Sequence, residues 1–325
     1  MTATNGQGTI GLISNARSRR NRTSMRELFS LLHDHPQVKH HALHEVSELP
    51  ESLREMAAEG VTHLVIGGGD GTVQAVISEL INASPFERPV KLSLLPAGMT
   101  NVIALDMGID ELPVPYLKRL IERVEAGQEG ERVDRPVLSL DLGDGGPSVH
   151  GFLLGAIAFY QGTILGRRKV HSLGFQQSLG SKLGLLLSAL RVIWYGPGEK
   201  SGFTGERVTP VIDGRTGKTE ELFLLVATTL SQILPGVAPF WGEGEGRMRL
   251  TTVSHPPKRF ARAFLPAIKG RPRPWMEEYG YCSQRAEQLA IDLSSPIVFD
   301  GEFLETDGGP GLKLSVGPTV TFHRY

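Results

Sequence analysis

Residues 61–80 read VTHLVIGGGDGTVQAVISEL, and this stretch decides the fold of the first part of the chain. The β-branched run that opens it predicts a buried strand, and the apolar pattern that follows Thr72 predicts a helix. Between the two lies the turn Gly67-Gly68-Gly69-Asp70-Gly71-Thr72. Glycines at such a turn let backbone N–H groups approach an anion, and the start of the helix adds a partial positive charge. The stretch therefore predicts a phosphate-binding βα turn.

Asp70 gives this turn a more specific meaning. A carboxylate would repel a bare phosphate, so its presence favours a site that also holds Mg²⁺ or a proton-donating hydroxyl, as in phosphoryl transfer. Two common phosphate motifs do not fit: the dinucleotide fingerprint needs glycine at Thr72, and the Walker A pattern needs a Gly-Lys-Ser/Thr ending. The alternative is a tight βα turn with an incidental Asp.

The same alternation of strand and helix extends over the first 130 residues. Strand-like runs occupy 9–14, 38–43, 61–66 and 90–95, and helical patterns occupy 25–32, 49–58, 73–81, 102–105 and 116–125. Strands that alternate with helices in this order predict a parallel sheet with helices on both faces. The fold class expected for residues 1–130 is a doubly wound α/β lobe.

The pattern changes after the Gly-rich stretch 127–131, which we take as the boundary between two lobes. Strand-like runs follow at 137–142, 221–228, 247–253, 288–293, 297–299 and 313–316. Helical patterns interrupt them at 181–194 and 259–268. Residues 131–305 are therefore expected to form a β-rich lobe.

Composition limits the functional classes. A chain of 325 residues corresponds to about two domains. Its net charge of −1 provides no overall field that would attract nucleic acid. The single cysteine, Cys282, suits a reducing compartment, and no secretory signal or membrane-spanning run is visible. We expect a cytoplasmic protein whose membrane contacts are peripheral.

The basic residues are nevertheless segregated. The windows 10–26, 145–198 and 251–276 contain no Asp or Glu. Within them, the segment 255–275 sets six cations beside aromatic residues, and the segment 164–173 sets three cations between apolar ones. Such segments favour contact with an anionic membrane surface. The alternative for 255–275 is an ordinary amphipathic helix with a polar outer face.

Four segments carry a resemblance to a known family. Gly68-Gly69-Asp70-Gly71-Thr72 resembles the signature of the diacylglycerol kinase and sphingosine kinase superfamily of lipid kinases, although NAD kinases and phosphofructokinases share a similar turn. Residues 13–19 resemble its N-P-x-S-G segment, with Ala16 and Arg19 as departures. Residues 95–101 resemble its P-x-G-T-x-N segment, with Met99 where the family has threonine. Residues 299–302 resemble its late D-G-E.

This resemblance implies a two-lobed lipid kinase in which an NAD kinase-like first lobe binds ATP, a β-rich lobe receives a lipid, and residues 306–325 return to the first lobe. It assigns nucleotide contacts to Asn15, Ser18, Arg19, Gly68, Gly69, Asp70, Gly71, Thr72, Gly98, Thr100 and Asn101. It assigns Mg²⁺ contacts to Glu302 and Asp134, and relatives of this kind often form homodimers.

The catalytic residues implied by the resemblance are Asp300, Asp70 and Glu302. Either Asp300 or Asp70 would be the general base, and the choice stays open. Without the resemblance, Asp300-Gly301 would be interpreted as a two-residue hairpin turn. The leading hypothesis is an ATP- and Mg²⁺-dependent kinase acting on a primary hydroxyl of diacylglycerol, ceramide, a sphingoid base or a related lipid. The alternatives are a degenerate kinase that only binds nucleotide or lipid, and a soluble-metabolite kinase of NAD kinase type.

Overall fold

The computed structural model of the chain describes residues 8–15, 22–98, 100–173, 189–198, 200–306 and 311–325. The chain forms two compact units, Met1–Arg135 with Thr319–Tyr325, and Pro136–Pro318. Two strands run from one unit into the other, β5 (Glu131–Asp141) and β17 (Leu312–Arg324). The boundaries predicted from the sequence, after residue 130 and before residue 306, lie earlier in the chain than these crossing points.

The sheet of the first unit is parallel and buried. Its strands are β1 (Ile10–Asn15), β2 (Lys39–Leu43), β3 (His63–Gly68) and β4 (Lys91–Pro96), in the order β2-β1-β3-β4, and the end of β17 adds to β4. Leu64, Val65 and Ile66 are fully buried although successive side chains of a strand point to opposite faces. Both faces of the sheet are therefore covered, which explains the continuous apolar runs in the sequence.

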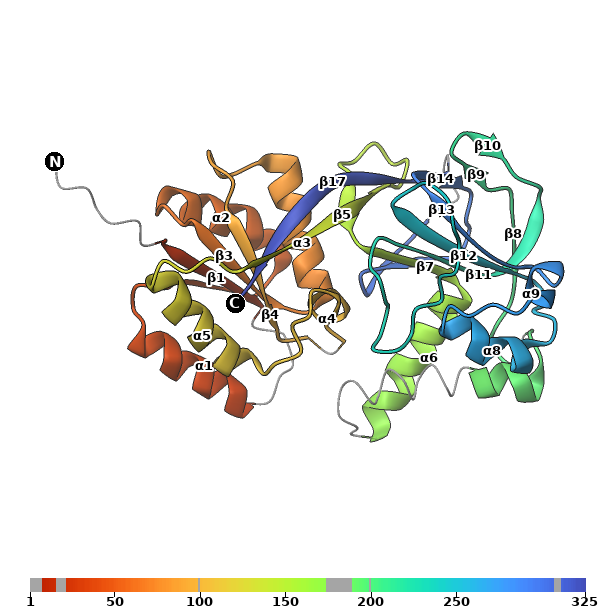
Figure 1. Cartoon of the computed structure of the whole chain (residues 1–325), viewed down its shortest axis with the longest axis horizontal. Coiled ribbons are helices and arrows are strands. Elements are labelled where there is room, and N and C mark those ends of the chain that lie inside the picture. The colour runs from red at the N-terminus through yellow and green to blue at the C-terminus, as the bar shows by residue number, and fades with distance from the viewer. Residues whose placement is uncertain (1–7, 16–21, 99, 174–188, 199, 307–310) are drawn as a thin grey trace. The chain divides into compact units, whose positions relative to one another are not determined.

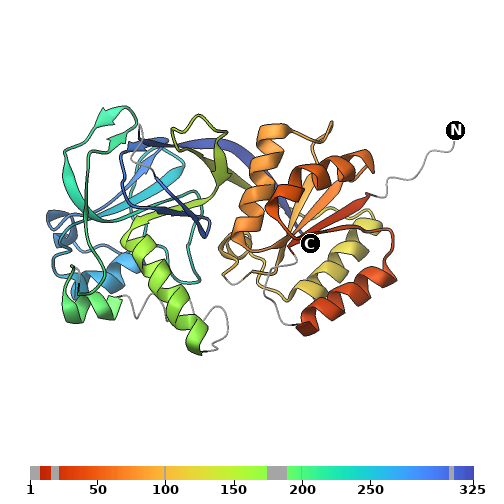
Figure 2. The ribbon, with the colours of Figure 1, turned by 180° about the vertical axis from the view of Figure 1, so that it is seen from behind.

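Helices cover the two faces of this sheet. The helices α1 (Arg22–Asp34) and α5 (Pro113–Glu125) lie side by side on one face, and α2 (Leu49–Ala58) and α3 (Asp70–Ala83) lie on the other (Figures 1 and 2). A 3₁₀ turn, η1 (Val46–Glu48), precedes α2, and the short helix α4 (Val102–Asp106) follows β4. The predicted doubly wound lobe is confirmed.

The second unit is built on a seven-stranded sheet and a smaller second layer. The large sheet contains β7 (Leu153–Ile157), β8 (Glu206–Val208), β11 (Glu220–Thr228), β12 (Met248–Ser254), β13 (Tyr281–Ala286), β15 (Ile297–Phe299) and β16 (Glu302–Leu304). The second layer contains β5, β6 (Val149–Gly151), β9 (Val211–Ile212), β10 (Arg215–Thr216), β14 (Gln288–Ile291) and the start of β17. Leu140, Leu154, Ala227 and Leu289 belong to the core that the two layers share.

Helices cover the other face of the large sheet. They are α6 (Ala158–Leu173), the helical residues 189–195, α8 (Phe260–Ile268) and α9 (Trp275–Glu278). A second core, with Val192, Phe223 and Ala263 among its buried members, joins these helices to the sheet. The helix predicted at 259–268 is confirmed as α8. Of the helix predicted at 181–194, residues 181–188 lie outside the described residues.

No sequence pattern predicted α6. It begins directly after β7, and the junction residue Ile157 has a φ of +60°. A β-branched residue seldom adopts this left-handed conformation, so the turn from strand to helix is a strained one. None of the helices in the described part of the chain is both long enough and apolar enough to cross a bilayer.

Candidate active site

The phosphate-binding turn predicted from the sequence joins β3 to α3. Gly69 is the N-cap of α3 in an extended conformation, and its carbonyl accepts hydrogen bonds from the N–H groups of Thr72 and Val73, at 3.0 and 3.1 Å. The first N–H groups of a helix have no carbonyl partner within the helix. Glycine at positions 69 and 71 leaves them without side-chain cover, which suits the approach of an anion.

A second glycine turn packs directly against the first. A Cβ atom on Gly98, just after β4, would lie 2.3 Å from the Cα atom of Gly69, and a Cβ on Gly69 would lie 3.2 Å from the Cα of Gly98. A Cβ on Gly68 would lie 2.5 Å from the Cβ of Thr72. Backbone therefore meets backbone at the carboxyl ends of β3 and β4, where open α/β sheets bind ligands.

Asn101 closes the second turn. Its Oδ1 accepts the N–H of Gly98 at 2.8 Å, and its Nδ2 donates to the carbonyl of Gly98 at 3.1 Å. The residue itself has a φ of +49°, a left-handed conformation that asparagine tolerates better than most residues. The structure thus places Asn101 in the predicted cluster and gives it a loop-closing role.

Asp70 is buried and links the two turns. Its Oδ2 accepts the hydroxyl of Thr100 at 2.9 Å, and its Oδ1 accepts the N–H of Ile103, in the first turn of α4, at 3.0 Å. Burial raises the pKa of this carboxyl above its ordinary value, and the hydrogen bonds oppose that shift. Thr100, one position after the family threonine, is therefore committed to Asp70, and Asp70 holds α3 and α4 together.

Asn15, at the end of β1, completes this cluster. Its Nδ2 donates to the hydroxyl oxygen of Thr72 at 3.3 Å, so the first parallel strand contributes a side chain to the phosphate-binding turn. The other predicted residues of this segment, Ser18 and Arg19, lie outside the described residues, as do the departures Ala16 and Met99.

Asp134 lies in the first unit on β5 and is exposed. Its Oδ1 accepts the hydroxyl of Thr321, on β17, at 2.6 Å. The adjacent Arg135 donates from Nε to the buried carboxylate of Asp106 at 2.9 Å. The β17 hydroxyl and the adjacent Arg135–Asp106 ion pair therefore help to fix the position of Asp134.

Asp300 lies in the second unit, at the tip of the β15–β16 hairpin. Phe299 and Glu302 pair across this hairpin, and Asp300 and Gly301 form its two-residue turn with φ values of +47° and +89°. Positive φ at both central residues is the signature of a type I′ turn. The hairpin expected for this dipeptide is confirmed, and it is compatible with a catalytic role for the same residue.

The carboxylate of Asp300 points into the unit. It accepts the N–H of Phe152 at 2.8 Å and the N–H of Leu153 at 2.9 Å, one on each oxygen. A Cβ atom on Gly151 would lie 2.1 Å from Oδ2 of Asp300, so this glycine makes room for the carboxylate. The sequence did not predict a role for Gly151, Phe152 or Leu153, because any residue except proline can donate a backbone N–H and the residue type therefore gives no signal.

Glu302, the other acidic residue of this hairpin, is exposed on β16. It belongs to the second unit, whereas Asp134 belongs to the first. Within the described ranges no group of three or more His, Cys, Asp or Glu side chains is arranged to hold a metal ion.

Comparison with known proteins agrees with the motifs. A model of the diacylglycerol kinase catalytic domain matches residues 9–129. A protein of Chromohalobacter salexigens named "Probable lipid kinase YegS-like" is 34% identical over 82 residues, 24% of this chain and 26% of that protein. One of the same name from Enterobacter sp. strain 638 is 29% identical over 136 residues, 42% of this chain and 45% of that protein. The chain spans less than half the length of these curated relatives.

The fold has a solved counterpart over nearly its full length. The crystal structure of a diacylglycerol kinase from Bacillus anthracis str. Sterne superposes with a TM-score of 0.62, covering 99% of this chain and 98% of that one, at 16% sequence identity. The predicted architecture, an α/β lobe followed by a β-rich lobe, is confirmed. So is the resemblance to the lipid kinases on which the site residues were assigned.

Proposed function

We propose, from the resemblance of the first unit to the diacylglycerol kinase catalytic domain, that this chain is an ATP-dependent lipid kinase. It would transfer the γ-phosphoryl group of ATP to a primary hydroxyl of a membrane lipid. The acceptor class is diacylglycerol, ceramide, a sphingoid base or a related lipid, and the enzyme would act in the cytoplasm at a membrane surface.

The observation that carries the nucleotide half of this proposal is the contact of Gly69 with Gly98. Two backbone turns without side chains, beside the start of α3, suit a triphosphate better than a neutral ligand, because N–H dipoles converge on an anion. Asn15 and Thr72 add polar side chains at the same edge of the sheet. Asp70 and Asn101 are proposed to support the nucleotide by fixing the turns.

Mg²⁺ is proposed as the metal that accompanies ATP, with Asp134 and Glu302 as the carboxylates that would hold it. When bound, it supplies positive charge to the phosphate oxygens as phosphoryl transfer proceeds. The exposed oxygens of both residues are accessible for this purpose.

We assign the general base to Asp300 and not to Asp70. Asp70 already has a structural role, because it accepts hydrogen bonds from the Thr100 hydroxyl and the Ile103 N–H and so anchors the α4 segment. The resemblance offers the position of Asp300 for this role, and each oxygen of Asp300 accepts one backbone N–H, so this carboxylate is held in a fixed orientation.

The experiment is transfer of radiolabelled γ-phosphate from ATP and Mg²⁺ to a panel of diacylglycerol, ceramide, sphingosine and phosphatidylglycerol in mixed micelles, with NAD as the soluble acceptor. One labelled lipid is the expected result. Label on NAD alone would show a metabolite kinase instead. ATP binding with no labelled product would show a degenerate kinase that binds without turnover.

Variants separate the two acids. Asp300→Asn should lower transfer by roughly 100- to 10,000-fold while ATP still binds, because a general base contributes about that factor. Asp70→Asn should mainly weaken ATP binding, because Asp70 holds the two glycine turns in place. Asp144→Asn is the matched control, since Asp144 lies in an exposed loop of the second unit, where its carboxylate accepts the N–H of Gly146. Full transfer by Asp300→Asn would refute the assignment of the base.

A further inference from the structure

The outer face of α8 and the segments on either side of it carry a set of basic side chains, here called the α8 surface. Its cations are exposed and comprise Lys258, Arg259, Arg262, Lys269, Arg271 and Arg273. Over the described ranges of the chain, none of the six lies within 4 Å of a carboxylate oxygen. No carboxylate of the described residues therefore forms an ion pair with them.

The inner face of α8 already accounts for the packing of the helix. Ala263 is fully buried, and the Phe260 ring packs edge-on against Phe223 of the sheet with centroids 5.9 Å apart. Arg259 stacks over the Tyr279 ring at 4.4 Å, which fixes the start of the helix on α9. Apart from Arg259, the cations of the α8 surface and Leu265 take no part in these contacts.

Large apolar side chains are exposed on α8 and on the neighbouring helix 189–195. Leu265, in the middle of α8, is 59% exposed, and Trp194, at the end of the neighbouring helix, is 80% exposed. Ile193 and Tyr195 are exposed as well. Isolated surface leucines are ordinary, but aliphatic and aromatic groups next to unpaired cations form the combination that membrane-surface helices present.

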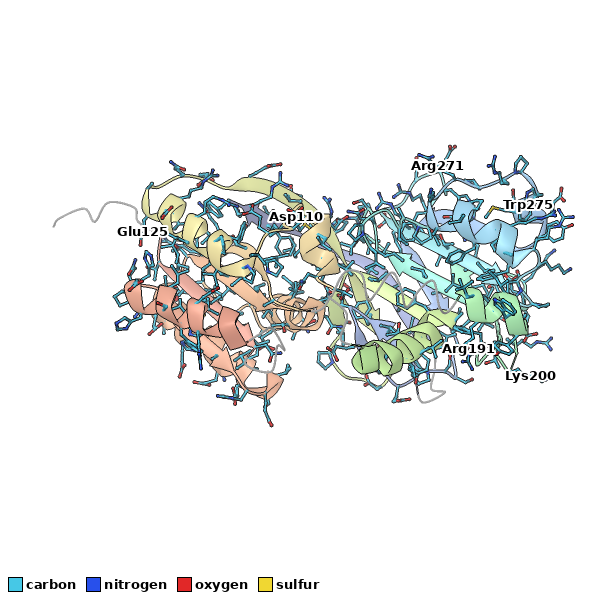
Figure 3. All side chains as sticks on the ribbon, turned by 90° about the horizontal axis from the view of Figure 1, so that it is seen from below. Asp110, Glu125, Arg191, Lys200, Arg271 and Trp275 are labelled. Atoms are coloured by element: carbon cyan, nitrogen blue, oxygen red, sulfur yellow. The ribbon has the colours of Figure 1, made fainter. Side chains whose placement is uncertain are left out.

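Two grooves flank α8. The first, of about 320 Å³, lies between Ile193 and Val192 on one side and Arg259 and Arg262 on the other. The second, of about 500 Å³, is lined by Arg262, Leu265, Lys269, Arg271 and Arg273 among others. In Figure 3 this side of the second unit faces the reader, with Arg191 and Lys200 labelled near the neighbouring helix and Arg271 near the end of the second groove. Both grooves thus combine an apolar wall with guanidinium groups, which bind phosphate in a bidentate manner.

We propose that the α8 surface docks the protein on a bilayer containing anionic phospholipids, with lipid phosphates in the two grooves and Leu265 and Trp194 in the acyl boundary. This deepens the proposed function by locating the membrane contact. Only the link between the docked bilayer and an acceptor lipid rests on the proposed function. Vesicle binding itself needs neither ATP nor turnover. The other basic segment, 164–173, lies on α6, and its side chains from residue 167 onward are outside the described residues.

Nucleic acid fits this surface less well. Phosphates of DNA or RNA would also satisfy the arginines, but the exposed Leu265 and Ile193 would gain nothing from a polar backbone. Burial of such groups at the headgroup boundary is favourable for a membrane-bound helix, and tryptophan and tyrosine are enriched at that depth. Of these two partners, only an anionic membrane therefore accounts for both the cations and the exposed apolar groups of this surface.

The test is sedimentation with vesicles of phosphatidylcholine alone and with phosphatidylglycerol added. The intact chain should bind only the anionic vesicles. Arg262→Gln/Arg271→Gln/Arg273→Gln should weaken this binding by about 100-fold, since each cation near the surface strengthens it severalfold. The matched control removes three exposed cations of the first unit, Arg88→Gln/Lys118→Gln/Arg123→Gln, and should bind as the unchanged protein does.

A second pair of variants tests the apolar contact. Leu265→Ser/Trp194→Ser should reduce vesicle binding and make the remainder more sensitive to salt, because only electrostatic attraction is left. Equal binding by the charge variant and its control would overturn the proposal. So would binding of a DNA duplex that displaces the vesicles.

Activity measurements keep the two proposals apart. The α8 charge variant should lose activity on lipid in vesicles and keep it on a short-chain, water-soluble acceptor. If the intact protein binds vesicles through α8 but transfers phosphate to no acceptor, the proposed function fails and the docking surface stands. If transfer occurs in both assays irrespective of the α8 substitutions, the docking surface fails and the kinase stands.

Discussion

The Cα atom of Gly69 lies only 2.3 Å from the point where a Cβ on Gly98 would stand. No other amino acid fits at position 98 unless one of the two turns moves. The turns belong to different βα units, so this contact couples the ends of β3 and β4 into one surface. The phosphate binding proposed for the β3–α3 turn would therefore depend on both turns.

Gly98→Ala should weaken ATP binding by tenfold or more, because the new methyl group must push the two turns apart. The overpacking should also lower stability by about 1–3 kcal/mol. Calorimetric titration with ATP and chemical denaturation measure the two effects. Gly166→Ala is the control. It also replaces a glycine with alanine, within α6, and a Cβ atom there would meet nothing within 4 Å. Unchanged ATP binding by Gly98→Ala would separate these turns from the nucleotide.

Asp70→Ala should destabilise the first unit by about 1–3 kcal/mol, because the buried N–H of Ile103 and the Thr100 hydroxyl lose their acceptor. Thr100→Val removes only the hydroxyl bond and should have a smaller effect. Urea denaturation of both variants measures the difference. Equal losses of stability would mean that the bond to Ile103 contributes nothing.

Asp300→Ala should destabilise the second unit, because the buried N–H groups of Phe152 and Leu153 both lose their partner. The expected loss is about 2–4 kcal/mol, with one unsatisfied buried donor costing about 1–3 kcal/mol. Hydrogen exchange at these two amides measures the local effect. Protection equal to that of the unchanged protein would contradict the hydrogen bonds on which the orientation of Asp300 depends.

Stability should fall as the pH is lowered below 6.5, and His63 should account for part of the decrease. Burial, then the charges of Lys91 and His323, lower its pKa from 6.5 to about 4, while Glu129 opposes them. The unfolded chain therefore takes up a proton between these values and the folded chain does not. The stabilisation is complete above pH 6.5 and is lost as the pH falls towards 4.

Thermal unfolding of the intact protein and of His63→Gln between pH 7 and 5 measures this effect. The variant also loses the contact between the His63 Nε2 atom and the Tyr325 hydroxyl, 2.8 Å apart, so its stability should be lower at pH 7. Its decrease towards pH 5 should be the smaller of the two. Parallel curves would show that His63 does not titrate differently in the folded chain.

The sequence predicted the first unit well because its signals are local. Strands buried on both faces give continuous apolar runs, and helices such as α2 follow the 3.6-residue period over their full length. The strand-like pattern by itself covers only 313–316, because Gly317 and Pro318 interrupt it; the resemblance implied the longer last strand, near 313–323, that β17 forms. Strands of two or three residues, such as β9 and β10, are too short to show the two-residue alternation of a strand in the sequence.

The candidate site was likewise predictable only where its signals are local. The glycine motifs identified the two turns that lie against each other in the structure, because two backbones can approach this closely only where the residues are glycine. The surroundings of Asp70 and Asp300 had no such signal, because Ile103, Phe152 and Leu153 contribute only N–H groups. The strained junction at Ile157, and with it α6, depends on contacts with the sheet that local propensity does not report.

The return of β17 determines the order in which the first unit can be completed during synthesis. Phe322 pairs with Leu92 of β4, and the Ser93 hydroxyl donates to the carbonyl of His323 at 2.8 Å. A ribosome releases these residues only after the whole second unit has emerged. Until then the nascent first unit carries β4 as an unpaired edge, which is open to pairing with other chains.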